Sequence, residues 1–110
     1  GNYARAEKLY AEAQEAALQD PEAVAERIVA LNNLALLLHQ QSRARESESL
    51  FRQLLPIVES AFGPEHAETA ICLENLSATL RRQDQTGEAA KLRRRAREMR
   101  LRLREERPLR

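Results

Sequence analysis

The sequence predicts an all-α protein in which about five antiparallel helices stack as repeats. One observation is an internal repeat: the segment LNNLALLL at residues 31–38 resembles the segment LENLSATL at residues 73–80, 42 positions later. Another is composition: alanine, leucine, glutamate, glutamine and arginine dominate, and only 4% of residues are aromatic, as is typical of helices. Helical pairs that cannot bury their own apolar faces become stable by stacking on copies of themselves, so a fixed period indicates a helical array.

The length of the chain and its cysteine content favour a single domain in a reducing compartment. The 110 residues suffice for one core. No apolar run approaches the roughly 20 residues of a membrane span, and the N-terminus has no signal-peptide pattern. A lone cysteine, Cys72, cannot form an internal disulfide. We therefore expect a cytoplasmic protein.

Apolar spacing places the first two helices. Side chains at intervals of three and four predict an amphipathic helix from Asn2 to about Leu18. Asp20 can then cap a second helix, and Pro21 suits its first turn. This second helix should run from about 22 to 41.

Prolines and glycines divide the rest of the chain. A third helix should follow the break at 42–44 and end near Ala61, with a bend near Pro56, which removes one backbone hydrogen bond. Gly63 suits the turn that follows a helix. The fourth helix should start at about Glu65, and a fifth should run from near Gly87 to Pro108.

The turns repeat together with the helices. Residues 1–9 align with residues 42–50 and 84–92. The segments 31–35, 46–50 and 63–66, with the sequences LNNLA, ESESL and GPEH, resemble the tetratricopeptide repeat, in particular the longer kinesin-light-chain variety. This resemblance implies a right-handed superhelix in one array over 1–110. Residues 1–19 would supply the second helix of a partial repeat, 22–62 a full repeat, and 65–110 a full repeat with an extended basic capping helix.

The resemblance also implies a function. Tetratricopeptide arrays are non-catalytic scaffolds whose first helices line a concave groove that binds a peptide segment of a partner protein. By resemblance, the groove residues would be Asn32, Asn33, Leu36, His39, Gln40, Glu74, Asn75, Ala78, Arg81 and Arg82, with Val29 and Ile71 beside them.

The duplicated asparagines Asn33 and Asn75 are the strongest candidates in this groove. A side-chain amide both donates and accepts hydrogen bonds, so it can bind a peptide group whatever the neighbouring side chain is. The alternative is that these amides join adjacent helices, because a buried amide needs a partner in either case. Arg81 and Arg82 could bind a carboxylate of an acidic ligand, or could only solvate the helix end.

A metal site or a catalytic site is not supported by the sequence. His39, His66 and Cys72 belong to separate elements, and no pair of histidines or cysteines has ligand spacing. The glutamates occupy solvated helix faces without a glycine-rich segment near them. We expect no cofactor, no bound metal and no enzymatic activity.

Charge is divided unequally along the chain. Residues 1–80 contain six basic and twelve acidic side chains, a net charge of −6, whereas residues 81–110 contain twelve basic and five acidic, a net charge of +7. The arginines of this segment could cap the array, bind nucleic acid or an acidic surface, or meet the acidic part of a second copy in a homo-oligomer. Aromatic residues that would stack on bases are absent from 81–110, which argues against nucleic acid.

Overall fold

The computed structural model describes residues 4, 5, 8, 11, 12, 15 and 20–106 of the chain. From residue 20 onward these residues form four helices and no strand: α2 (Pro21–Gln40), α3 (Ala44–Phe62), α4 (Ala67–Arg82) and α5 (Thr86–Glu106). The predicted all-α fold is therefore confirmed. The helix expected from Asn2 to about Leu18 falls mostly outside the described residues. No described helix combines the length and apolar character needed to cross a membrane.

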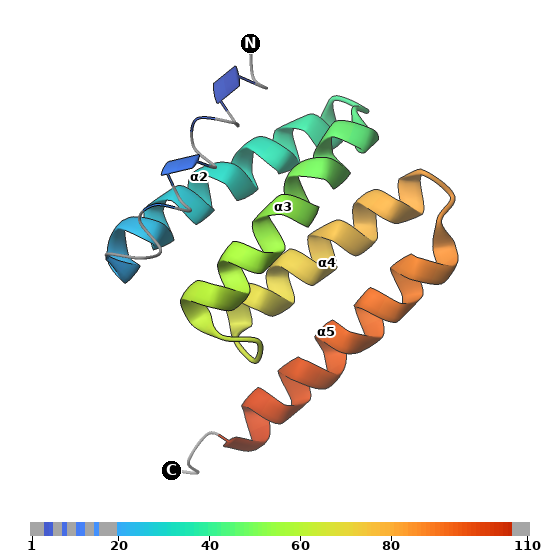
Figure 1. The fold of residues 1–110 in the computed structure, drawn as a ribbon. Coiled ribbons are helices and arrows are strands. Elements are labelled where there is room, and N and C mark those ends of the chain that lie inside the picture. The colour runs from blue at the N-terminus through green and yellow to red at the C-terminus, as the bar shows by residue number, and fades with distance from the viewer. Residues whose placement is uncertain (1–3, 6–7, 9–10, 13–14, 16–19, 107–110) are drawn as a thin grey trace.

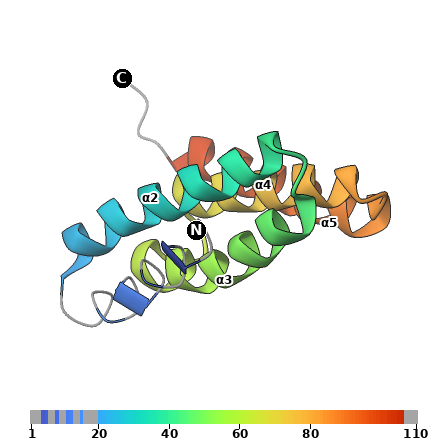
Figure 2. The same ribbon diagram turned by 90° about the horizontal axis from the view of Figure 1, so that it is seen from above.

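Consecutive helices pack against one another in chain order (Figure 1). Helix α3 lies between α2 and α4, and α4 lies between α3 and α5. Helices α2 and α4, the first members of the two pairs, also contact each other directly. Seen from above, α3 lies to one side of α2 and α4 (Figure 2). The two first helices therefore present a joint surface that α3 does not cover.

Capping side chains fix the starts of α2 and α4. Oδ1 of Asp20 accepts a hydrogen bond from the backbone N–H of Glu22 at 3.0 Å, as predicted, and Pro21 occupies the first turn of α2. Nδ1 of His66 accepts from the backbone N–H of Glu68 at 3.0 Å in the same way. Helix α4 accordingly begins at Ala67, two residues later than predicted, because His66 is its cap.

Helix α3 continues through Pro56 and ends at Phe62. Proline has no N–H, so the carbonyl of Arg52 lacks its usual helical donor. The bend expected there stays a prediction. Helix α3 is followed by Gly63, as expected, but its φ of 95° and ψ of 162° give an extended conformation open mainly to glycine rather than the left-handed turn.

The turns after α2 and α4 share one geometry. Ser42 and Asp84 stand 42 residues apart and have φ values of 62° and 60°. The N–H of Arg43 donates to the carbonyl of Leu38 at 2.9 Å, and the N–H of Gln85 donates to the carbonyl of Leu80 at 3.0 Å. Each helix therefore ends in the same left-handed turn, although neither turn contains glycine.

The core follows the leucine pattern. The repeated leucines at 31, 38, 73, 76 and 80 are all buried. One buried cluster includes Phe51 and joins α2, α3 and α4, reaching α5 at Ala89. A smaller one joins α4 to α5 through Leu73, Ala96 and Met99. Burial of this kind contributes about 1.5–3 kcal/mol per large apolar side chain. The core thus runs through the whole stack.

Two buried serines mark where the helices of each pair cross. Oγ of Ser47 on α3 donates to the carbonyl oxygen of Ala35 on α2 at 2.8 Å. In the second pair the roles are exchanged, and Oγ of Ser77 on α4 donates to the carbonyl oxygen of Ala89 on α5 at 2.8 Å. The two repeats are therefore equivalent in packing, because small residues allow the same close approach in both.

Candidate functional site

The predicted groove residues lie on α2 and α4, and one hydrogen bond joins these helices. Nδ2 of Asn75 donates to Oδ1 of Asn32 at 3.0 Å. Both side chains are half-buried, whereas Asn33 is exposed. The duplicated asparagines are therefore not equivalent in their surroundings: the structure brings Asn75 to Asn32 and leaves Asn33 facing solvent.

We use the name α2/α4 wall for the exposed and half-buried side chains of the predicted groove on these two helices, without Glu74, which is described below. Its members recur at helical intervals, and all but Asn32 have a counterpart 42 residues away in the other repeat. They are Val29, Asn32, Asn33, Leu36, His39 and Gln40 of α2, and Ile71, Asn75, Ala78, Arg81 and Arg82 of α4. Val29 is 55% exposed, so the wall includes an uncovered apolar side chain as well as amides and cations.

His39 and Arg82 close one end of the wall. Nη1 of Arg82 donates to the backbone carbonyl of His39 at 2.8 Å. Nδ1 of His39 lies 3.5 Å from Oγ1 of Thr79, whose hydroxyl donates to the carbonyl of Asn75 at 2.9 Å. Burial, reinforced by the Arg82 guanidinium, lowers the pKa of His39 below its ordinary value. These surroundings therefore favour the neutral form of the ring.

Arg81 differs from its neighbour. Its side chain is exposed and makes no hydrogen bond or ion pair with any residue that the structure describes. Arg82 binds the His39 carbonyl of α2 and lies 3.4 Å from the hydroxyl of Ser42. At this end of the wall, the guanidinium of Arg81 is therefore the one available to a carboxylate.

Glu74 is bound by α5. Its two carboxylate oxygens accept hydrogen bonds from Nε and Nη2 of Arg100 at 2.7 and 2.8 Å. These hydrogen bonds hold the pKa of Glu74 below its usual range. The repeat makes Glu74 the counterpart of Asn32 in the predicted groove, but its carboxylate is bound by Arg100 of α5.

Another surface, distinct from the wall, lies along α5 beside Glu74 of α4. It is a cavity of about 650 Å³ with an arginine-rich lining, made by Glu74, Ala90, Arg93, Arg94, Arg97, Arg100, Leu101 and Arg104. We call this lining the arginine face. The sequence predicts that residues 81–110 are basic. The structure adds which of their arginines line the same cavity.

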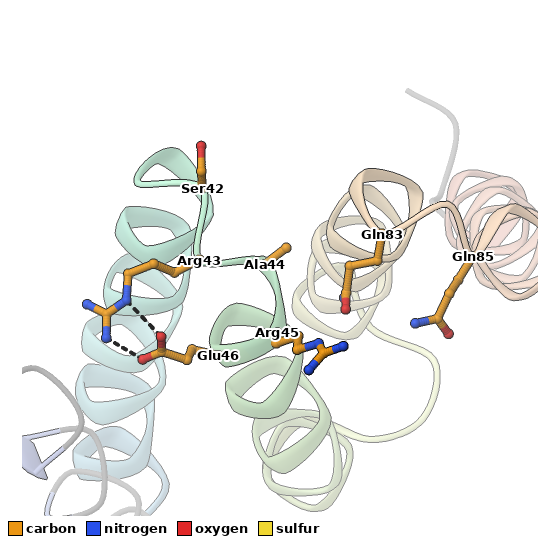
Figure 3. Close-up of a pocket in the computed structure, with 7 residues that line it drawn as sticks. All are labelled: Ser42, Arg43, Ala44, Arg45, Glu46, Gln83 and Gln85. Carbon is orange, nitrogen blue, oxygen red and sulfur yellow. Dashed lines mark hydrogen bonds and ion pairs between the residues drawn. The ribbon is translucent and has the colours of Figure 1, made fainter.

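Another cavity, of about 610 Å³, lies at the turns (Figure 3). It is lined by residues 42–46 together with Gln83 and Gln85. Arg43 and Glu46 are paired to each other, and Arg45 extends toward the two glutamines (Figure 3). No sequence pattern indicates this cavity, because its lining consists mainly of ordinary polar turn residues.

Cys72 and His66 have structural surroundings. Burial, with the nearby Glu59 carboxylate, raises the pKa of the Cys72 thiol to about 12, and its Sγ lies 3.8 Å from the carbonyl of Phe51. A protonated, buried thiol is a poor nucleophile. His66 caps α4, and its ring stacks on Phe62 with centroids 4.8 Å apart. Among the described residues no three histidine, cysteine or acidic side chains gather as metal ligands would.

Comparison with known proteins agrees with this arrangement. The family model for the tetratricopeptide repeat matches residues 26–102, which include most of α2, all of α3 and α4 and most of α5. No significant match to the chain was found among curated proteins or among solved structures. The chain belongs to the tetratricopeptide repeat family, whose repeats generally mediate protein–protein interactions.

Proposed function

We propose that the α2/α4 wall is the concave groove of a non-catalytic scaffold and that it binds an extended segment of a partner protein. The observation that carries this proposal is the direct link between the two helices, in which Asn75 donates to Asn32. This hydrogen bond sets the two first helices side by side, so their uncovered side chains can act on one ligand. The period of 42 residues further supports the longer, kinesin-light-chain-like variety of the repeat.

The chemistry of the wall defines the kind of segment that it suits. Val29 and Ile71 occupy corresponding places at one end and offer apolar contact. The Asn33 amide is exposed and can pair with a peptide group. Arg81, at the other end, lacks a partner among the described residues and can pair with a carboxylate. The preferred ligand therefore has an apolar side chain at one end and an acidic side chain at the other.

The length of the wall limits the segment. From Ile71 to Arg81 a helix rises about 15 Å. An extended chain advances about 3.3 Å per residue, so a segment running along the wall would make contact through about five residues.

Selection from a random peptide display library on the wild-type protein provides the test. Ala78 is exposed at the centre of the wall, so Ala78→Arg adds bulk there without disturbing the core. We expect the selected peptides to bind this variant at least about tenfold more weakly, a loss of about 1.4 kcal/mol. Ser60→Arg is the control, since Ser60 is a small exposed residue on α3, outside both the wall and the arginine face. Equal binding of all selected peptides by both variants would remove the wall from the proposal.

A further inference from the structure

The arginine face of α5 corresponds in the repeat to the face of α3 that packs against the next helix. A shift of 42 residues superimposes α3 on α5 in sequence, so Phe51 corresponds to Arg93 and Val58 to Arg100. Phe51 and Val58 are almost completely buried, and the thiol of Cys72 on α4 lies against the Phe51 carbonyl. The face of α3 that receives the next helix thus corresponds to the face of α5 that lines the cavity.

The arginines of α5 divide into two groups. Arg95, Arg100 and Arg102 each bind a glutamate of an earlier part of the chain: Glu59 at 3.4 Å, Glu74 at 2.7 Å and Glu65 at 2.8 Å. The others make no hydrogen bond or ion pair with a described residue, and all of them line the cavity. These are Arg93, Arg94, Arg97 and Arg104. Their charges are therefore available to a ligand.

Glutamate–arginine pairing is also the way in which this chain joins its helices. Arg52 on α3 binds Glu88 on α5 at 2.8 Å, and Arg100 binds Glu74 across the α4–α5 interface. Guanidinium groups match carboxylates through paired hydrogen bonds. A surface with four available guanidiniums around one cavity is complementary in charge to a row of carboxylates on another helix.

We propose that the arginine face binds an acidic α-helix of a partner protein, seated against α4 and α5 as α4 is seated against α2 and α3. The available arginines from Arg93 to Arg104 extend over about 16 Å of helix, which is about three turns of a bound helix. Ala90 and the 51% exposed Leu101 offer apolar contact beside the charges. Nucleic acid fits less well, because residues 81–110 include no aromatic side chain and the Glu74 carboxylate lies in the lining.

The test uses a labelled, alanine-rich helical peptide that carries a stripe of glutamates along one face. Its binding to the full chain is measured by fluorescence anisotropy at low and at physiological salt. The variant pair Arg93→Glu and Arg97→Glu should weaken binding by about tenfold or more. The control pair Lys91→Glu and Arg45→Glu makes the same change of charge at two exposed cations that make no hydrogen bond or ion pair with a described residue and lie outside this cavity, and it should leave binding within about twofold.

Two further arms make the outcome decisive. A peptide with glutamine in place of glutamate should not bind, and circular dichroism should show unchanged helix content in both variant pairs, because the reversed arginines of the face are exposed. Equal loss of binding in the two pairs would overturn the proposal by showing attraction to net charge alone. Binding of a random DNA duplex without binding of the acidic helix would also overturn the proposal. So would dissociation of an oligomer of this chain by the Arg93→Glu and Arg97→Glu pair, because a second copy would then occupy the face.

Discussion

The side-chain amide of Asn75 donates to the side-chain oxygen of Asn32 at 3.0 Å, although the two residues are 43 positions apart in the chain. For Asn75 this is the arrangement that the sequence left open as an alternative, in which an amide joins adjacent helices. It shapes the α2/α4 wall in two ways, because it fixes the separation of the helices and leaves the exposed Asn33 as the amide available to a ligand.

Replacement of Asn75 should therefore affect stability, and replacement of Asn33 should not. Asn75→Ala removes the donor and leaves the half-buried Asn32 oxygen without it, so we expect the free energy of unfolding to fall by about 1 kcal/mol. Asn33→Ala should change it by less than about 0.5 kcal/mol. Urea denaturation at neutral pH measures both values. Equal losses for the two variants would contradict the assignment of Asn32 as the partner.

The left-handed turns offer a gain in stability. Ser42 has a φ of 62°, a conformation that costs a non-glycine residue about 1–2 kcal/mol. Ser42→Gly should raise the free energy of unfolding by about 0.5–1 kcal/mol, since glycine adopts this φ freely but loses more entropy on folding. Asp84→Gly should gain less, because aspartate tolerates the conformation better than serine does. Thermal unfolding measures the shifts. Ser42→Ala is the control, and it should give no gain, because it removes the hydroxyl and keeps the strained backbone.

The two buried serines should contribute equally to stability. Ser47→Ala and Ser77→Ala each remove a hydroxyl that donates to a backbone carbonyl at 2.8 Å, and each should lower the free energy of unfolding by about 1 kcal/mol. Ser60 is exposed on α3, so Ser60→Ala should be neutral or slightly stabilising through helix propensity. A large loss in only one of the buried pair, measured by chemical denaturation, would show that the repeats do not pack alike.

Protonation of His39 should weaken the fold. Its folded-state pKa lies below the ordinary value, first through burial and then through Arg82. The unfolded chain thus takes up a proton at a higher pH than the folded one, so the stabilisation is complete above about pH 6.5 and is lost as the pH falls toward the folded-state pKa. His39→Gln should make the free energy of unfolding less dependent on pH between about 7 and 5. Identical slopes for the variant and the wild type, in urea titrations across this range, would contradict the prediction.

Much of the fold could be predicted because its signals are local. Leucine spacing marks the buried side of each helix, and the pairs Asp20-Pro21 and Gly63-Pro64 mark the ends. The predicted helix bounds lie within one or two residues of the observed bounds wherever the structure describes them. The start of α4 was misplaced because a histidine cap, His66, is harder to recognise in sequence than aspartate or serine.

The candidate site was less predictable because it depends on how helices from different repeats lie against one another. Periodicity makes Asn33 and Asn75 equivalent, but hydrogen bonding depends on the separation and rotation of α2 and α4, and these bring Asn32 to Asn75. The same applies to Glu74, whose partner Arg100 lies 26 residues away on α5. Only packing selects these partners.

The most direct test of the proposed groove is amide chemical-shift mapping of the labelled protein with a peptide selected from the random library. We expect the largest shifts to fall on the α2/α4 wall, at Asn33, Ala78 and Arg81, and to disappear in Ala78→Arg. Shifts confined to α5, at Arg93 and Arg97, with the wall unchanged would contradict the account.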